Sequence, residues 1–323
     1  MKASTTRSVE QSLQRLGQWL AAAGYRFVTV TPLTHQRVLA RPHDPERSDL
    51  RDAFGWNRLF SKDRLPADLT PCLLDDGWLQ STATGLLQGN VRFSSLDGLL
   101  FAHSPFPTAQ EDAVFFGPDT YRFASFIRHQ LRMQPLPRSP RIADMGCGAG
   151  PGGLVAARAW QAQPNGCEIV LADINPRALL HATANVAVAG YRNVQCVQSD
   201  LFSNVAGRFD LIVANPPYLM DDASRTYRHG GGQFGEALSE RILKESLDRL
   251  TPGGRLLLYT GSTIVEGRDA FRDSVMAYAT AHDFAVHYEE LDPDVFGEEL
   301  QGQAYAEADR IAAVGVVVQR RAA

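Results

Sequence analysis

Four adjacent residues, Asn215, Pro216, Pro217 and Tyr218, follow the apolar run Phe209–Ala214 and have the types needed to orient a planar amino group. Prolines cannot donate strand hydrogen bonds, so the run must end there. The Asn215 side-chain oxygen and the Pro216 carbonyl could each accept one N–H, which would turn the nitrogen lone pair toward an electrophile. Tyr218 offers a flat face for an amide or a base. A proline turn that only ends a strand is the alternative interpretation.

A glycine-rich turn follows another apolar run, 141–145, which carries Asp144 near its end. Glycine permits positive φ angles and lets a ligand approach the backbone. Gly148, Gly150 and Gly153 fit the GxGxxG spacing of dinucleotide sites, although such turns also occur for structural reasons. A nicotinamide dehydrogenase would explain this loop but neither Asp144 nor the Asn-Pro-Pro-Tyr turn. The candidate ligand-binding residues of this segment are Asp144, Gly146, Cys147, Gly148 and Gly150.

Two further acids follow predicted strands. Asp173 could accept two hydrogen bonds from ribose hydroxyls, and Asp200 could accept one from an adenine amino group. Each acid alone would more often be a helix cap or a turn residue. With Asp144 they form three acids at successive strand ends, which indicates a nucleoside-like ligand. The apolar residues expected beside that ligand are Ile174, Leu201 and Phe202.

Short strands that alternate with helices must position these residues. The sequence predicts strands at 141–145, 168–174, 194–199, 209–214, 254–260, 285–291 and 311–319. The clearest helices are 176–189, 236–250 and 267–281. Nearly continuous apolar strands between helices indicate a parallel sheet covered on both faces, and the last two strands indicate an antiparallel hairpin. The predicted fold class is therefore α/β and doubly wound, with ligands bound at the carboxyl ends of the strands.

The N-terminal part has a different pattern. Residues 9–23 predict an amphipathic helix, and 85–103 predict a strand and a hairpin that turns at Asp97-Gly98. We predict a small α+β, winged-helix-like domain for substrate recognition at 1–108, a linker helix within 109–140, and a catalytic domain at 141–323. The proline-punctuated stretch 135–140 marks the change of pattern.

The order Asp-x-Gly-x-Gly-x-Gly, Asp173, Asp200, Asn-Pro-Pro-Tyr resembles the class I S-adenosylmethionine-dependent methyltransferases over roughly residues 115–320. The resemblance implies a seven-stranded, Rossmann-like methyltransferase sheet and S-adenosyl-L-methionine as the cofactor, with no metal. It implies that Asp144 and the 146–150 backbone approach the methionine part, that Asp173 takes the ribose, and that Asp200 takes the adenine. Asn215 would adjoin the cofactor, and Asp119 and Thr120 would close over it from the linker side.

The segment His229–Leu238, with Gly-Gly-x-x-Gly, is similar to the HemK/PrmC family, which methylates the glutamine of peptide-release factors at N5. That family has Pro-Glu-Thr-Glu where this chain has Pro118–Tyr121, and its N-terminal domain is a helical bundle. The N-terminal segment and linker are more similar to a bacterial group that carries a small-methyltransferase domain. For that group the resemblance implies the cofactor but not the acceptor.

The methyl acceptor stays open between a protein glutamine amide, RNA or DNA adenine at N6, and a small molecule. A DNA-binding regulator without catalysis is disfavoured by the intact Asn-Pro-Pro-Tyr turn. The acidic stretch Glu289–Glu299 would repel phosphates, although it could also be an ordinary solvated surface. Basic residues could grip phosphates or pair with nearby acids, namely Arg122, Arg128, Arg132, Arg138, Arg141, Arg225, Arg228 and His229.

Composition sets further bounds. The 323 residues are 44% hydrophobic and 21% charged, with a formal charge of −4, so no global positive field attracts nucleic acid. No apolar stretch approaches the roughly 20 residues needed to cross a bilayer, and the first residues lack the apolar core of a signal peptide. We therefore expect a cytoplasmic protein. Four scattered cysteines without a CxxC pair disfavour a disulfide framework or a zinc site, and nothing requires a dimer.

Overall fold

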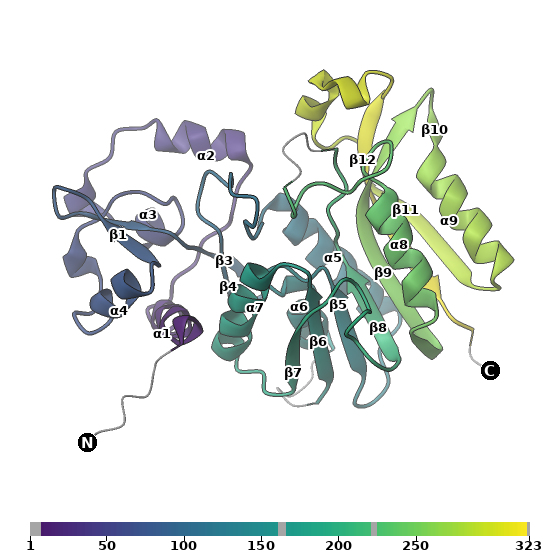
Figure 1. The fold of residues 1–323 in the computed structure, drawn as a ribbon, viewed down its shortest axis with the longest axis horizontal. Helices are drawn as coiled ribbons and strands as arrows, with labels where there is room; N and C mark the ends of the chain where they lie inside the picture. Colours follow the sequence, from purple (N-terminus) through teal and green to yellow (C-terminus); the bar gives the residue numbers. More distant parts are fainter. Residues whose placement is uncertain (1–7, 161–165, 221–224, 322–323) are drawn as a thin grey trace.

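Among the described residues, the central sheet has eight strands, seven of them in the order β11-β12-β9-β8-β5-β6-β7 and a short β10 (Arg268–Asp269) beside β9 (Figure 1). The bounds of the seven are β5 (Arg141–Met145), β6 (Glu168–Asp173), β7 (Val194–Gln198), β8 (Phe209–Ala214), β9 (Leu250–Val265), β11 (Ala285–Asp292) and β12 (Arg310–Gln319). Five neighbouring strands, β7, β6, β5, β8 and β9, run parallel to one another. Strand β12 is antiparallel to both of its neighbours, β9 and β11. The predicted α/β class with a C-terminal antiparallel hairpin is therefore confirmed.

The structure is a computed structural model and describes residues 8–160, 166–220 and 225–321. Met1–Arg7, on which the expectation about a signal peptide partly depends, lie outside the described residues. Within those three ranges, none of the helices combines the length and the apolar character that crossing a membrane requires.

Strand β9 is longer than the sequence pattern predicts. It was expected over 254–260 and extends over Leu250–Val265, because β12 pairs with it from Arg255 to Ile264. Its far end also pairs with the two-residue strand β10 (Arg268–Asp269), which delays the start of the following helix. Pairing partners that are distant in the sequence therefore set these boundaries.

Helices cover both faces of the sheet. One face carries α5 (Pro118–Met133), α6 (Pro151–Ala159) and α7 (Pro176–Ala189), and the other carries α8 (Ala237–Leu247) and α9 (Ala270–Ala281). Adjacent strand residues point to opposite faces. Ile142 of β5, for example, belongs to the first core and Ala143 to the second. This double burial explains why the strands are almost continuously apolar.

The N-terminal part has its own core of helices and hairpins (Figure 1). Its elements are α1 (Val9–Ala22), α2 (Pro32–Leu39), α3 (Leu50–Phe54), α4 (Thr70–Asp75), the hairpin β1 (Leu79–Ser81)–β2 (Leu87–Gly89) and the hairpin β3 (Arg92–Leu96)–β4 (Leu99–His103). The helix at α1 and the hairpin turn at Asp97-Gly98 agree with the sequence pattern. Helices α2 to α4 were not predicted, because segments of five to eight residues carry too little periodicity.

The two parts are joined by buried polar contacts. The Asn185 side chain on α7 accepts a hydrogen bond from the Ala102 N–H (2.7 Å) and donates to the carbonyls of Ala102 (3.1 Å) and Ala149 (2.9 Å). The Tyr121 hydroxyl on α5 accepts from the Thr29 N–H at 3.0 Å. Tyr121 occupies the position of the last acid in the Pro-Glu-Thr-Glu motif, so this departure serves the contact between the two parts.

Candidate active site

Parallel register brings the predicted site residues to one edge of the sheet. Met145 of β5 lies opposite Ala172 of β6 and Ala214 of β8, and Ala214 lies opposite Leu258 of β9. The residues that come next along these strands are Gly146, Asp173, Asn215 and Tyr259. They share the carboxyl edge, where doubly wound sheets bind ligands.

Two carboxylates, the half-buried Asp173 and the buried Asp144, hold the glycine turn after β5. Asp173 accepts hydrogen bonds from the N–H groups of Gly148 (2.7 Å) and Asn175 (2.9 Å). Asp144, only 2% exposed, accepts one from the Gly153 N–H at 2.7 Å. The acids that face the ligand position therefore also fix the backbone around it.

Glycine is required in this turn for two reasons. Gly146, Gly148 and Gly150 have φ angles of 68°, 54° and 83°, a region that other residues rarely adopt. A Cβ at Gly152 would lie 2.8 Å from an Asp144 carboxylate oxygen. The start of α6 can approach that carboxylate only because this position has no side chain.

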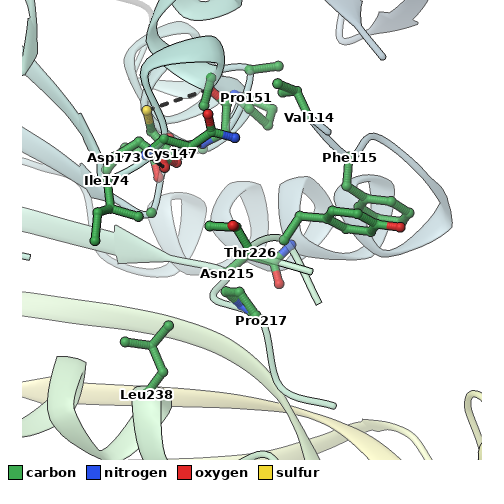
Figure 2. A pocket seen from close by; sticks show the side chains of 18 of the residues that line it. Val114, Phe115, Cys147, Pro151, Asp173, Ile174, Asn215, Pro217, Thr226 and Leu238 are labelled. Atoms are coloured by element: carbon green, nitrogen blue, oxygen red, sulfur yellow. Dashed lines mark hydrogen bonds between the residues drawn. The ribbon is translucent and has the colours of Figure 1, made fainter. Parts of the chain in front are cut away.

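A cavity of about 390 Å³ opens at this edge, and we call it the large cavity. Figure 2 shows Cys147 and Asp173 on one side and Asn215 and Pro217 on the opposite side. The predicted site residues that line it are Thr120, Asp144, Gly146, Cys147, Gly148, Asp173, Ile174, Asp200, Leu201, Asn215 and Pro217. Its wall mixes carboxylates with apolar side chains such as Leu238, which suits a ligand with an apolar ring and positively charged groups.

Two predicted site residues, Phe202 and Gly150, line neither this cavity nor the smaller one beside it. Phe202 is 3% exposed and packs in the core, with its ring centroid 6.4 Å from that of Phe209. The chain turns at Leu201 (φ 46°), so Leu201 lines the cavity while Phe202 points into the core. Phe202, expected beside the ligand, therefore packs behind the cavity wall and does not line the cavity. Gly150 lies at the start of α6, where a Cβ would meet the Leu171 side chain at 3.0 Å, and its role is structural.

A second cavity, of about 70 Å³, adjoins the first, and we call it the small cavity. It shares Phe115, Asn215, Pro217 and Tyr227 with the large cavity. Its other lining residues are Asp119, Pro216, Tyr218, Leu219, Arg228 and Phe296. All of Asn215–Tyr218 line the small cavity. Asp119, expected beside the cofactor, also lies there, whereas its neighbour Thr120 lines the large cavity.

Burial changes the protonation of the carboxyl groups in the large cavity. Desolvation raises the pKa of Asp144 to about 8, although the hydrogen bond from Gly153 opposes the rise. Burial also raises the pKa of Asp173, against the bonds from Asn175 and Gly148. A positively charged ligand would favour the ionised forms of both groups. Perturbed carboxyl groups in a cavity are typical of binding sites.

Asp119 belongs to a buried polar network beside the small cavity. Its Oδ1 accepts hydrogen bonds from the Tyr259 hydroxyl (2.9 Å) and the Arg122 guanidinium (3.1 Å), and Arg122 also pairs with Asp292 at 3.0 Å. Burial raises the pKa of Asp119, whereas the bond from Tyr259 and the charge of Arg122 lower it. The Tyr218 hydroxyl is buried near this carboxylate without a well-formed hydrogen bond.

Several side chains at the site were not predicted from the sequence. They are Phe115, Tyr227, Tyr259, Phe296 and, on α8, Arg241, which pairs with Asp200 at 3.0 Å. Tyr259 follows Leu258, which lies opposite the last residue of β8. This position at the carboxyl edge of the sheet could have identified Tyr259 as a candidate site residue. The rings of Phe115 and Tyr227 are parallel to within 3°, with centroids 5.9 Å apart, yet they come from distant loops that no local pattern connects.

The glycine segment after Tyr218 folds back against the end of β8. Leu219 and His229 form an isolated parallel bridge. A Cβ at Gly230 would lie 1.9 Å from the Gly235 carbonyl oxygen and 2.8 Å from that of Pro217. The segment that carries the HemK/PrmC similarity therefore supports the Asn-Pro-Pro-Tyr turn through backbone packing.

Four of the arginines considered for phosphate binding are paired with acids: Arg122 with Asp119 and Asp292, Arg128 with Asp97, Arg141 with Glu168, and Arg228 with Glu299. Asp292, the last residue of β11, and Glu299 belong to the acidic stretch Glu289–Glu299. This stretch reaches the cavity edge, because Phe296 lines the small cavity. Arginine side chains therefore offset part of that acidic stretch.

Known proteins share the part of the chain that carries these cavities. Residues 124–282 match the family model described as methyltransferase small domain. The chain is 37% identical over 116 residues to the ribosomal RNA small subunit methyltransferase C of Pasteurella multocida, covering 36% of this chain and 31% of that protein. It is 33% identical over 161 residues to the release factor glutamine methyltransferase of Deinococcus radiodurans, covering 47% and 55%.

A solved structure, a putative transferase from Pyrococcus horikoshii, has a similar fold, with a TM-score of 0.50 at 10% identity over 79% of this chain and 83% of that one. The chain spans about a third of the length of the relative from Pasteurella multocida and about half of the length of the one from Deinococcus radiodurans. The large cavity is lined by carboxylates, glycine backbone and apolar side chains, and this lining fits S-adenosyl-L-methionine. Through residues 124–282, this chain carries a small methyltransferase domain, similar to that of the HemK/PrmC-type release factor glutamine methyltransferases.

Proposed function

We propose that this chain transfers a methyl group from S-adenosyl-L-methionine to a planar amino nitrogen, and that the acceptor is a protein glutamine amide, methylated at N5. The position of Asn215 and Pro217 carries the proposal, because these residues line both cavities. An amino group held at Asn215 in the small cavity would face a cofactor in the large one.

In this proposal the large cavity holds the cofactor. Asp144 and the glycine turn receive its amino acid part, Asp173 its ribose, and Asp200, Ile174 and Leu201 its adenine. When bound, S-adenosyl-L-methionine supplies a methyl group on a positively charged sulfur. Asn215 and Pro217 form the boundary across which that methyl group would pass.

The Asn-Pro-Pro-Tyr turn would make the acceptor nitrogen reactive. An amide nitrogen is a poor nucleophile because its lone pair is delocalised. The Asn215 side-chain oxygen and the Pro216 carbonyl would each accept one N–H, turn the lone pair toward the large cavity, and stabilise the positive charge that develops. The Tyr218 ring packs closely on Gly261, where a Cβ would lie 2.4 Å from it. Alignment of the acceptor nitrogen with the methyl group then supplies most of the rate acceleration.

The size of the small cavity favours an amide over a base. Its volume of about 70 Å³ is small beside the roughly 390 Å³ of the large cavity. A carboxamide makes a smaller demand on this space than a purine ring system, which would require the walls at Phe115, Tyr227 and Phe296 to move. One similar protein is named a release factor glutamine methyltransferase, which supports the same choice.

The second candidate acceptor is an amino group on an RNA base. Phe115 is 37% exposed at the border of both cavities, and its ring is parallel to that of Tyr227. Exposed aromatic rings bind unpaired bases by stacking. The relative from Pasteurella multocida is named for ribosomal RNA. In this alternative the N-terminal α+β part would read the nucleic acid.

Methyl labelling separates the candidates. The purified protein is incubated with methyl-labelled cofactor and a bacterial cell extract, and the labelled macromolecules are treated with protease or nuclease. We expect protease to release the label. Release by nuclease would move the assignment to the nucleic-acid acceptor. That acceptor would also give binding that weakens steeply with salt, because phosphate contacts release counterions.

The Asn215→Ala variant tests the mechanism. We expect incorporation to fall by about 100-fold or more, since removal of one acceptor for developing charge has that effect. Cofactor binding, measured by calorimetry, should be retained. Asn193→Ala is the matched control, because Asn193 makes one hydrogen bond to Cys167 and lines neither cavity. Undiminished incorporation by Asn215→Ala would refute the orienting role of this residue.

A further inference from the structure

We infer that Asp119 is a catalytic residue of the acceptor site, where its carboxylate takes the proton that the methylated nitrogen must lose. The inference rests on the proposed function. It gives Asp119 a role different from the cofactor contact that its position in the motif implied, because Asp119 lines the small cavity and not the large one.

The reaction requires a proton acceptor. The amino nitrogen uses its lone pair to form a bond to the methyl carbon, while the carbon–sulfur bond breaks and its electron pair stays on sulfur. The nitrogen then carries a positive charge and must release one proton. The Asn215 amide oxygen and the Pro216 carbonyl can orient the N–H groups, but neither retains a proton at neutral pH. A carboxylate can.

Asp119 is the one carboxylate among the described residues that line the small cavity. It lies in the first turn of α5 and is 5% exposed. The Tyr259 hydroxyl and the Arg122 guanidinium both donate to its Oδ1. The buried Tyr218 hydroxyl lies near the same carboxylate. This network holds the carboxylate in place at the wall of the small cavity.

The groups around Asp119 tune its protonation. Two arginines, Arg122 on the same helix and Arg228 after β8, lie close to Asp119, as does the carboxyl group of Asp292 at the end of β11. The tyrosines that face the network or the small cavity are Tyr218, Tyr227 and Tyr259. Burial raises the pKa of the Asp119 carboxyl against the opposing effects of Tyr259 and Arg122. A carboxylate with a raised pKa is a stronger base than an ordinary one and is better matched to proton transfer near neutral pH.

The test compares Asp119→Asn, which keeps an oxygen for Tyr259 and Arg122, with Asp119→Glu, which keeps a carboxylate. Initial rates of label incorporation into a bacterial cell extract are measured from pH 5 to 9, and cofactor dissociation constants by calorimetry. We expect Asp119→Asn to lose about 100-fold or more in rate with cofactor affinity within about twofold of wild type. The wild-type rate should rise with pH to a plateau, and this rise should be absent in Asp119→Asn and present in Asp119→Glu.

Asp97→Asn is the matched control. Asp97 pairs with Arg128, which lies on α5 as Asp119 does, and Asp97 lines neither cavity. Its rate and pH profile should match wild type. An Asp119→Asn rate within tenfold of wild type, or a rate loss accounted for by weaker cofactor binding, would overturn the inference. If Asn215→Ala remains inactive in that case, the proposed function survives. If both variants transfer normally, the proposed function itself has failed.

Discussion

Asp144 is a residue whose protonation depends on what the large cavity holds. Its carboxylate is fixed by the Gly153 N–H and nevertheless lines the cavity. Desolvation raises the pKa of Asp144 to about 8, which favours the protonated form at neutral pH when no positively charged group lies beside it. A positively charged ligand group restores the ionised form. Ligand binding and proton release at this residue are therefore linked.

The linkage predicts that affinity for S-adenosyl-L-methionine rises with pH between about 5.5 and 7.5, by up to about tenfold per pH unit. The direction follows because binding must remove a proton from Asp144, and this removal costs less as pH approaches the pKa. Calorimetry in two buffers of different ionisation enthalpy would detect the released proton.

Asp144→Asn, which cannot release a proton, is the control for this experiment. It should bind more weakly and lose the part of the pH dependence that Asp144 contributes. His229 also lines the cavity and remains in both proteins, so the difference between their pH profiles isolates Asp144. Equal pH dependence in wild type and Asp144→Asn would contradict the prediction.

Among the elements, the turn after β8 depends on two neighbours for its shape. Gly261 of β9 accommodates the Tyr218 ring, and Gly230 packs its backbone against the carbonyls of Pro217 and Gly235. Both contacts are too close for a side chain. The elements that follow the turn in sequence therefore pack directly against Pro217 and Tyr218 of the turn.

Gly230→Ala tests this dependence. A methyl group placed 1.9 Å from the Gly235 carbonyl oxygen must displace one of the two segments. We expect label incorporation to fall by about tenfold to 100-fold, because a shift of about 1 Å in a positioning group can have that effect. Gly297→Ala is the matched control, since nothing lies within 4 Å of the added methyl. Equal incorporation by the two variants would show that the segment does not position the turn.

For the whole molecule, three buried histidines lie in or beside the N-terminal part. Their imidazole rings are almost fully buried at His35, His103 and His181, and His181 packs edge-on against Trp78. Burial is the main reason that the pKa of His35 is lowered to about 4, that of His181 to about 3, and that of His103 well below its usual value. These residues must be neutral in the folded protein.

A histidine with a lowered pKa destabilises the fold in acid, because the unfolded chain takes up the proton first. For His181 the loss begins below about pH 6.5 and continues to about pH 3, at roughly 1.4 kcal/mol per pH unit. Asp144, whose pKa is raised, opposes this trend, so the comparison must be made between variants.

We expect His181→Leu to lower the pH sensitivity of the unfolding free energy by roughly 1.4 kcal/mol per pH unit between pH 6 and 4. Urea denaturation at several pH values measures it. His287→Gln, at a side chain that is 65% exposed, should leave the slope unchanged. The same slope in His181→Leu as in wild type would mean that His181 is already charged in the folded state.

The sequence by itself determined the class of fold and most of the large cavity. Strands buried on both faces must be apolar along their length, and parallel strands place their carboxyl ends together. Asp144, Asp173, Asp200 and Asn215 could therefore be assigned to one edge of the sheet from the residue pattern alone. Local rules also located the glycine turn, because positive φ angles restrict the residue type.

The tertiary structure alone decided which residues complete the acceptor site. Asp119 lies in the small cavity because α5, β9 and the turn after β8 meet there, and its partner Tyr259 is far away in the sequence. Phe202 points into the core because the chain turns at Leu201. Arginines that could have gripped phosphate are paired with acids from other elements. Periodicity and turn rules depend on neighbours along the chain, whereas these contacts depend on distances in space that only packing sets.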